Sequence, residues 1–296
     1  MSALISETEP SGTVTDGQVW KVVRYYDETR FDYNVAWFSD ENSALHAGFY
    51  DEHAHNHRDA VGNTNRFLAD AAGIQSGDRV LDAGCGRGGS AFWLAQNRQA
   101  TVVGITPVAS QVDDARRKAV ALGLENEVSF FQKDYLHSGF GDETFDVVWA
   151  CESVCHTEQK QEFFHEAFRV LKPGGRLVIA DCMRFRRDLP PSDEAFLLEG
   201  VNGWEVPDID TGREHYEKAS AAGFEAVRIL DCSKYVRVSF RNIYRHCRRW
   251  LWLGYLLNFA GIRSDVQHAN QMGSMKIFQA MERGLWFYGV MTAERR

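Results

Sequence analysis

Two side chains suited to acid/base chemistry lie four residues apart after an apolar run. The segment FDVVWACESVCH contains Glu152 and ends at His156. Residues four apart face the same side of a single helical turn, so both side chains would reach the same ligand. Carboxylates and imidazoles are frequent proton acceptors and donors in active sites. We therefore predict that Glu152 and His156 are catalytic.

A cluster of glycines follows an earlier apolar run, in the segment RVLDAGCGRGGSAFWLAQ from Arg79. The run, the glycines and the helical spacing after them predict a strand, a tight turn and a helix. A dinucleotide site would require an acidic residue about 20 positions further on, after the next strand. The sequence there reads Gly104-Ile105-Thr106-Pro107. This disfavours NAD, and the Gly-Lys-Ser/Thr of a Walker loop is absent as well.

A second cluster consists of alternating histidines, His53, His55 and His57. On a strand they would point to one side and could ligate a metal. The surrounding sequence, HAHNHRDAVGNTNRFLA, is more typical of a loop that enters a helix, where this spacing separates the side chains. We therefore predict no metal site.

Arginines are concentrated in the segment RVSFRNIYRHCRRWLWLGY, which begins at Arg237. At helical spacing, Arg241, Arg245, Arg248 and Arg249 lie mostly on one face. If that face turns inward, it forms a receptor for a phosphate or diphosphate. If it turns outward, it is a solvated surface or a contact with an anionic membrane. The sequence leaves these alternatives open.

The elements that position these residues alternate between strands and helices. Strands are predicted at 79–83, 100–106, 127–131, 145–152, 176–181, 226–232 and 285–293. The alternation predicts an α/β fold with a parallel, doubly wound sheet. We divide the chain into an N-terminal helical cap (1–66), a core (67–236), a helical lid insertion (237–284) and a last sheet strand of the core (285–296). Both additions are expected to cover the carboxyl edge of the sheet, where ligands bind.

The composition restricts the class of protein. With 33 Lys+Arg against 41 Asp+Glu, the formal charge of −8 argues against a nucleic-acid-binding protein. The six cysteines form no CxxC pair, and MSALISETEP is not a secretory signal. The apolar stretch 250–262 is shorter than a membrane-spanning helix requires. We expect a cytoplasmic protein without integral membrane association, whose partner is a small-molecule substrate, and leave open whether it forms a homo-oligomer.

Four motifs occur in one order: LDAGCGRGG, QKDY, FDVVWACES and LKPGGRLVIAD. Together, over residues 79–181, they resemble the class I S-adenosyl-L-methionine-dependent methyltransferases. The resemblance implies a Rossmann-like class I methyltransferase sheet and S-adenosyl-L-methionine as the cofactor. HAGFYDE and the neutral GIT…Q are similar to segments of the sterol, tocopherol, cyclopropane-lipid and prenyl-diphosphate C-methyltransferases. DAGCGRGGS is especially similar to the glycine loop of geranyl diphosphate C-methyltransferase.

The resemblance also implies which residues hold the cofactor. Asp82 and the backbone of Gly84 and Gly86 would hold its charged amino acid part. The further cofactor residues implied are Asp134 and Tyr135 at the adenine, Tyr26 at the methionine end, and Thr106 with Gln111 at the ribose. Thr106 and Gln111 would replace the acidic residue that binds the ribose in most class I enzymes.

The activity implied is methyl transfer to a small hydrophobic metabolite. The leading hypothesis is C-methylation of an isoprenoid (prenyl) diphosphate alkene, with Glu152 as the base. Aromatic rings stabilise a developing cation, which makes Tyr50, Trp204 and Trp252 candidates. The substrate-binding residues predicted are His46, Tyr50, Arg245 and Trp252. Mg²⁺ is expected only if the substrate is a diphosphate. The alternatives are an O- or N-methyltransferase that tailors a natural product and a non-catalytic SAM-binding partner protein.

Overall fold

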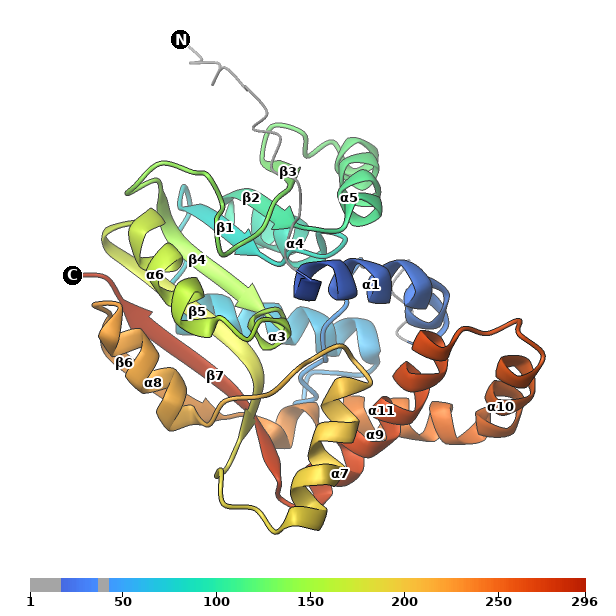
Figure 1. Cartoon of the computed structure of the whole chain (residues 1–296). Coiled ribbons are helices and arrows are strands. Elements are labelled where there is room, and N and C mark those ends of the chain that lie inside the picture. The colour runs from blue at the N-terminus through green and yellow to red at the C-terminus, as the bar shows by residue number, and fades with distance from the viewer. Residues whose placement is uncertain (1–16, 37–42) are drawn as a thin grey trace.

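The computed structural model describes residues 17–36 and 43–296, which include one seven-stranded sheet (Figure 1). The strands lie in the order β3-β2-β1-β4-β5-β7-β6. Their bounds are β1 (Arg79–Ala83), β2 (Thr101–Thr106), β3 (Val128–Gln132), β4 (Phe145–Cys151), β5 (Leu171–Arg184), β6 (Glu225–Asp231) and β7 (Trp286–Glu294). All predicted strands are present. The strand β5 is longer than predicted, because Leu171 already pairs with Phe145 ahead of a register shift.

The prediction of a parallel sheet is wrong for one strand. Strands β1 to β5 pair in parallel, but β7 is antiparallel to both β5 and β6. The strand β7 lies between two strands that precede it in the sequence, and it carries Tyr288 opposite Cys182 of β5. Strand direction depends on the path of the long connection before it, which hydrophobic patterning does not specify.

Helices cover both faces of the sheet, as expected for a doubly wound fold. They are α1 (Gly17–Ala36), α3 (His57–Ala71), α4 (Gly89–Arg98), α5 (Ala109–Leu122), α6 (Lys160–Val170), α7 (Pro191–Asn202), α8 (Gly212–Ala221), α9 (Ser233–Arg249), α10 (Leu251–Phe259) and α11 (Asp265–Glu282), with a short 3-10 turn η1 (Val154–His156). Successive strand residues point to opposite faces. Val80 and Val147 therefore pack with α3 and α4, whereas Leu81 and Val148 pack with α6.

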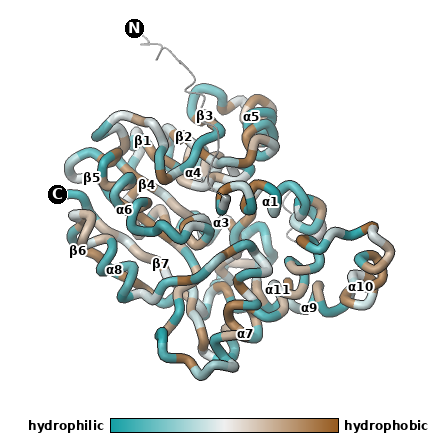
Figure 2. The backbone as a smooth tube through the Cα atoms, in the orientation of Figure 1, coloured by the Kyte–Doolittle hydropathy of each residue, from teal (hydrophilic) through white to brown (hydrophobic). Residues whose placement is uncertain are grey.

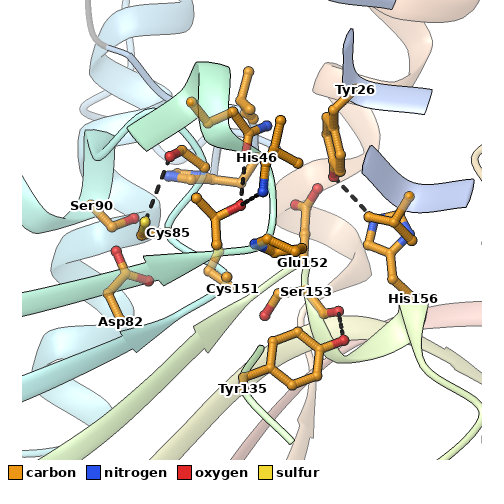
Figure 3. A pocket seen from close by; sticks show the side chains of 18 of the residues that line it. Tyr26, His46, Asp82, Cys85, Ser90, Tyr135, Cys151, Glu152, Ser153 and His156 are labelled. Carbon is orange, nitrogen blue, oxygen red and sulfur yellow. Dashed lines mark hydrogen bonds between the residues drawn. The ribbon is translucent and has the colours of Figure 1, made fainter. Parts of the chain in front are cut away.

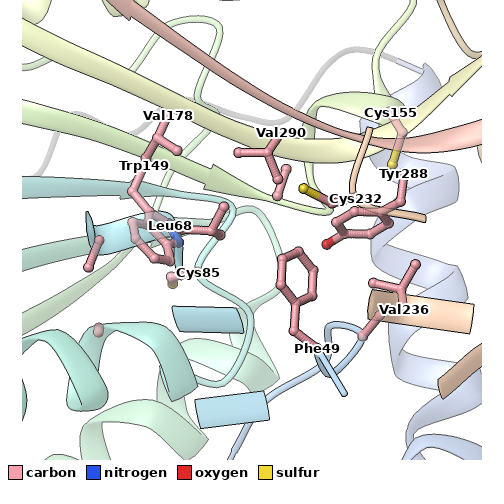
Figure 4. Close-up of a cluster of buried hydrophobic side chains, with 14 of the residues drawn as sticks. Phe49, Leu68, Cys85, Trp149, Cys155, Val178, Cys232, Val236, Tyr288 and Val290 are labelled. Carbon is pink, nitrogen blue, oxygen red and sulfur yellow. The ribbon is translucent and has the colours of Figure 1, made fainter. Parts of the chain in front are cut away.

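The hydrophobic interior follows the strands, which are the brown centre of Figure 2. The larger core cluster continues from the sheet toward the C-terminal helices, where Phe49, Val236 and Tyr288 meet (Figure 4). Phe49 stacks on Tyr235 of α9, with ring centroids 5.4 Å apart. The segment before the first strand is thereby anchored to the late insertion.

The N-terminal cap and the late insertion also meet through α1 and α11. Arg263 forms an ion pair with Asp32 of α1 at 2.7 Å, and the Tyr25 hydroxyl donates to Asn270 Oδ1 of α11 at 2.9 Å. The predicted boundary at residue 237 falls within α9, which begins at Ser233. Of the predicted cap, residues 1–16 and 37–42 lie outside the described residues. In the described chain no helix combines the length and apolarity needed to cross a bilayer.

Candidate active site

A cavity of about 920 Å³, open to solvent, lies at the carboxyl ends of β1, β2, β3 and β4, beneath α1. We call it the first cavity. It is lined by all eight residues predicted to hold the cofactor: Tyr26, Asp82, Gly84, Gly86, Thr106, Gln111, Asp134 and Tyr135. Glu152, His156 and His46 line it as well. The structure thus brings together residues from six separate segments of the sequence.

The glycine loop after β1 leaves room in this cavity because its backbone excludes side chains. Gly84 has φ +96°, and a Cβ there would lie 2.3 Å from the Cβ of Ser153. Gly86 has φ +51°, and its Cβ would approach Leu45 to 3.1 Å. Only glycine adopts such a φ at no steric cost. The loop therefore presents bare backbone to a ligand.

Asp82, at the end of β1, is a buried carboxylate that lacks a full set of partners. Its Oδ2 has no hydrogen-bond partner among the described residues. Burial raises the pKa of this carboxyl group to about 7. A buried acceptor at the wall of a cavity is stabilised when a cationic ligand donates to it.

The residues that follow β2 and β3 are held in place by short hydrogen bonds. Thr106 Oγ1 donates to Gln111 Oε1 at 2.8 Å, which leaves the amide N–H groups of Gln111 as donors. Asp134 Oδ1 accepts from the Leu136 N–H at 2.9 Å. The Tyr135 hydroxyl donates to the Ser153 carbonyl at 3.1 Å (Figure 3). This part of the wall carries both donors and acceptors, as recognition of a ribose and an adenine requires.

Glu152 follows β4 directly and has a left-handed backbone conformation, with φ +53°. Its Oε1 accepts from the Ala47 N–H at 2.7 Å and from the Tyr288 hydroxyl at 2.8 Å. No donor from the described residues reaches Oε2. Burial raises the pKa of Glu152 to about 7, although the bonds from Ala47 and Tyr288 act in the opposite direction. A carboxylate with a pKa near neutrality is suited to accept a proton.

His156, in η1, is held on both ring nitrogens. Its Nδ1 lies 3.3 Å from the Glu205 carbonyl oxygen, which can only accept, so Nδ1 carries the proton. Nε2 therefore accepts from the Tyr26 hydroxyl at 3.0 Å (Figure 3). Burial lowers the pKa of His156 to about 4, so the ring is neutral at pH 7. In this arrangement His156 fixes Tyr26, and through it α1, over the cavity.

A second cavity, of about 580 Å³, adjoins the first. The two share Tyr26, Leu45, Glu152 and His156. The remaining lining residues of the second cavity are Tyr33, Cys155, Asp181, Cys182, Val201, Trp204, Val206, Ile209 and Asn270. Its walls are mostly apolar and aromatic, which is typical of a site for a small hydrophobic molecule.

The carboxylates of the second cavity have no cation beside them in its described lining, although the buried Lys160 nearby acts to lower the pKa of Asp181. Asp181 Oδ2 accepts from the Cys155 N–H and Oδ1 from the Cys182 N–H, both at 2.8 Å, and burial raises its pKa. No lysine or arginine is among the lining residues that the structure describes. The undescribed segments 1–16 and 37–42 contain neither residue in their sequence. The second cavity therefore suits a ligand without negative charge.

Three of the four predicted substrate residues lie away from both cavities. Tyr50 has its ring beside His57, 6.5 Å between centroids, and Trp252 is 64% exposed on α10. Arg245 is exposed because the inward face of α9 is formed by Val236, Ser239, Phe240, Ile243 and Cys247. The inward arginine face is therefore not observed. His46 does line the first cavity, and its Nδ1 donates to the Ala47 carbonyl at 3.0 Å.

Several residues of the site were not identified from the sequence: the wall residues Asp181, Tyr33 and Asn270, and Tyr288, which holds Glu152 from outside the cavity lining. Tyr288 reaches Glu152 from β7, 136 positions later in the chain. No spacing pattern links residues so far apart. Among the sequence candidates for aromatic contact, only Trp204 lines the second cavity. The described residues also contain no group of three or more metal-ligating side chains.

Known proteins match this chain at the core of the sheet and across the whole fold. Residues 81–179 match the family model described as Methyltransferase domain. The chain is 36% identical over 174 residues to Methyltransferase GfsG of Streptomyces halstedii, which covers 58% of this chain and 61% of that protein. It is 31% identical over 196 residues to 27-O-demethylrifamycin SV methyltransferase of Amycolatopsis mediterranei, covering 66% and 72% of the two chains.

A solved structure is similar over nearly the full length. Geranyl diphosphate C-methyltransferase from Streptomyces coelicolor A3(2), in complex with Mg²⁺, geranyl diphosphate and S-adenosyl-L-homocysteine, superimposes with a TM-score of 0.73. The match covers 96% of this chain and 100% of that one, at 20% sequence identity. At this identity the similarity establishes the fold.

Proposed function

Because this chain belongs to the S-adenosyl-L-methionine-dependent methyltransferases, we propose that it transfers a methyl group to a small, uncharged and largely apolar acceptor in the second cavity. The observation that carries the proposal is the position of Glu152 in the walls of both cavities. When the methylated atom must lose a proton, the transfer requires a base that reaches both the methyl donor and the molecule that is methylated.

The first cavity fits the cofactor by its polar groups. The unpartnered Oδ2 of Asp82 would accept from the cofactor's amino group, and the bare glycine backbone would lie against its amino acid part. Thr106 and Gln111 would bind the ribose, and Asp134 the adenine amino group. When bound, S-adenosyl-L-methionine supplies a methyl group made electrophilic by the sulfonium. The chain's own contribution is to bind, orient and exclude water.

Glu152 is the proton acceptor in this proposal. Ala47 and Tyr288 hold one carboxylate oxygen, so the other is available to the acceptor molecule. His156 is already engaged at both nitrogens. We therefore propose that His156 positions Tyr26 over the bound molecules, while the proton goes to Glu152.

We propose an uncharged methyl acceptor because of the residues that line the second cavity. A diphosphate there would face Glu152 and Asp181 with no lysine or arginine in the described lining. The buried Lys160 near Asp181 already donates to two backbone carbonyls. The lining thus supports the hydrocarbon part of the isoprenoid diphosphate hypothesis and gives no support to its diphosphate part or to Mg²⁺. The rings of Tyr26, Tyr33 and Trp204 offer π-faces to a carbocation. An alkene that is methylated at carbon is our leading acceptor.

Methylation of a hydroxyl group in a natural product is the second candidate. It is favoured by the relative named 27-O-demethylrifamycin SV methyltransferase, whose name places its reaction at an oxygen. Glu152 would then accept the hydroxyl proton instead of a carbon-bound one.

The test is to incubate the full chain with methyl-labelled S-adenosyl-L-methionine and matched acceptors. A prenyl alcohol and its diphosphate share one hydrocarbon chain and differ in the anionic diphosphate group. Sterols, phenols and hydroxylated macrolides complete the panel. We expect label in an uncharged acceptor and transfer to the diphosphate lower by at least about ten-fold. Mass spectrometry of the product then distinguishes a new carbon–carbon bond from a methyl ether.

Two results would contradict the proposal. Preferential labelling of the diphosphate would show that the second cavity is not an uncharged site. Tight binding of S-adenosyl-L-methionine without transfer to any acceptor class would favour the non-catalytic SAM-binding alternative.

A further inference from the structure

The helix α10 exposes an apolar face to solvent, and the Tyr255 ring at its border contacts α11 through His268, at 4.7 Å between ring centroids. Trp252, Leu256, Phe259 and Ile262 are 64%, 55%, 92% and 73% exposed, and Tyr255 beside them is 51% exposed. The spacing of three or four residues places Trp252, Leu256 and Phe259 on one side of the helix, and Ile262 follows in the turn after it. We call these five residues the α10 patch. Figure 1 shows α10 at the outer end of the C-terminal helices, and Figure 2 shows its largely hydrophobic character.

The opposite side of α10 is fixed on the protein. Gly254 is buried against α11, where a Cβ would lie 2.1 Å from Gln271 Oε1. Ser264 starts α11 with a capping box immediately after the α10 patch. The α10 patch is therefore the outward face of a helix that is held in place. Exposed apolar residues gathered in this way mark an interaction site more often than scattered ones do.

The chain around the α10 patch carries a strong positive charge. Residues 232–264 contain seven Lys/Arg and no Asp/Glu. Since the whole chain has a formal charge of −8, the remainder carries −15. Arg237 and Arg263 are paired with Glu282 and Asp32.

Three arginines next to the α10 patch remain free to bind an anion. Arg245, Arg248 and Arg249, at the end of α9, are exposed and have no ion-pair partner among the described residues. We call them the arginine rim. The positive charge is concentrated beside an apolar helix face on an otherwise acidic chain. This combination is complementary to a membrane surface, which has anionic headgroups over an apolar interior.

We propose that the α10 patch and the arginine rim dock this protein on an anionic lipid surface. α10 has nine residues, so it would lie in the interface and not span the bilayer. Trp and Tyr are enriched where headgroups meet acyl chains, and Leu, Phe and Ile insert below them. The arginines would contact the anionic headgroups. This inference goes beyond the proposed function, because it assigns a binding surface outside both cavities.

A second copy of the chain is the less favourable occupant. In a symmetric dimer the same surface faces itself, so the arginine rims of two copies would meet around the buried apolar residues. Like charges then oppose association, whereas anionic lipids neutralise the same arginines. The two occupants can be distinguished experimentally. Binding to anionic lipid weakens as salt is raised, whereas a dimer doubles the mass of the protein in the absence of vesicles.

The test measures co-sedimentation of the full chain with vesicles of phosphatidylcholine alone and of equal parts phosphatidylcholine and phosphatidylglycerol. We expect binding to the anionic vesicles that weakens as salt is raised. The double substitution Phe259→Asp/Ile262→Asp should lower the partition coefficient by at least about ten-fold. The matched control is Phe185→Asp/Leu230→Asp, which changes residues 52% and 53% exposed elsewhere and should leave binding unchanged.

A second pair of variants isolates the charge contribution. Arg248→Glu/Arg249→Glu should lower binding to the anionic vesicles by at least about ten-fold, because each basic residue near such a surface contributes on the order of a five-fold change in affinity. Arg186→Glu/Arg213→Glu changes the net charge equally at exposed positions remote in sequence and should have little effect.

The proposal is overturned if neither vesicle type sediments the protein, or if both arginine variants weaken binding equally. It is also overturned if sedimentation equilibrium shows a dimer that Phe259→Asp/Ile262→Asp dissociates, because the α10 patch would then join two copies. Calorimetric binding of S-adenosyl-L-methionine is measured on every sample. Loss of cofactor binding with intact vesicle binding would contradict the proposed function and not the lipid surface.

Discussion

The first cavity and the second cavity are adjacent but are assembled in different ways. The first is formed mainly by loops that directly follow β1, β2, β3 and β4, so most of its predicted functional residues lie within a few positions of a strand end. Tyr26 on α1 and His46 are the exceptions. The second combines α1, η1, the end of β5, α7 with the loop that follows it, and α11. Recurrent strand–loop units can carry a common ligand site, whereas a wall made of distant helices varies with each insertion.

The two cavities also differ in how their carboxylates are satisfied. Asp82 in the first has an unpartnered oxygen, whereas Asp181 in the second accepts from two backbone N–H groups. Glu152 lies between these cases, with one oxygen held and the other available. The difference supports the proposal that the first cavity binds a cationic group and the second a neutral one, with proton transfer where they meet.

The largest effect is expected at this meeting point. Glu152→Gln retains size and hydrogen bonding but cannot accept a proton, so kcat should fall by about 10²- to 10⁴-fold. Affinity for S-adenosyl-L-methionine should change little. Single-turnover kinetics and calorimetry measure the two quantities. Glu158→Gln, an exposed neighbour, is the control. If Glu152→Gln turns over its acceptor within a few-fold of the unmodified protein, Glu152 is not the base.

The next largest effect is expected at Asp82. Asp82→Asn removes the charge that would bind the cofactor's ammonium group, which should weaken S-adenosyl-L-methionine binding by about 10- to 100-fold. Under this proposal the cofactor binds the ionised carboxyl group of Asp82, whose pKa is raised to about 7 by burial. Affinity should therefore rise as pH increases toward 7, with proton release on binding below that pH.

Calorimetry in buffers of different ionisation enthalpy measures this proton release. The Asp82→Asn variant should show none from this site, and Asp113→Asn, exposed on α5, should behave as the unmodified protein. A pH-independent affinity in the unmodified protein would show that Asp82 does not bind the amino group.

A matched pair of cysteines tests whether the two cavities bind independently. Cys151 lines only the first and Cys182 only the second, and each is half-buried near the end of a neighbouring strand. Cys182→Phe should raise the KM for the acceptor by about ten-fold or more and leave cofactor affinity unchanged. Cys151→Phe should weaken cofactor binding instead. Equal effects of both variants on both ligands would show that the cavities act as one site.

The smallest effect is expected at Tyr288. Its hydroxyl donates to Glu152 and thereby lowers the pKa of that carboxyl group, so Tyr288→Phe should raise the pKa. The acid limb of the kcat/KM profile should move to higher pH, with a fall of about three- to ten-fold at pH 7. Tyr216→Phe, half-exposed on α8, is the control. If the midpoint of the acid limb of the kcat/KM profile does not move, Tyr288 contributes packing only and does not set the pKa of Glu152.

The amino-acid sequence alone determined the secondary-structure elements of this protein. Apolar runs, turn residues and helical periodicity identified all seven strands, because each is a property of a few consecutive residues. The eight residues predicted to hold the cofactor came from the resemblance of short motifs, and all eight line the first cavity. Seven of them lie at or shortly after the carboxyl ends of β1, β2 and β3, and Tyr26 lies on α1.

Only the tertiary structure decided how distant segments meet. The antiparallel direction of β7 brings Tyr288 to Glu152, and the packing of α11 on α1 brings Asn270 beside Tyr33. The rotation of α9 about its axis sends Arg245 outward, although its spacing fits either orientation. Direction, rotation and long-range contact result from the packing of the whole core, in which each element is placed by neighbours from other parts of the chain.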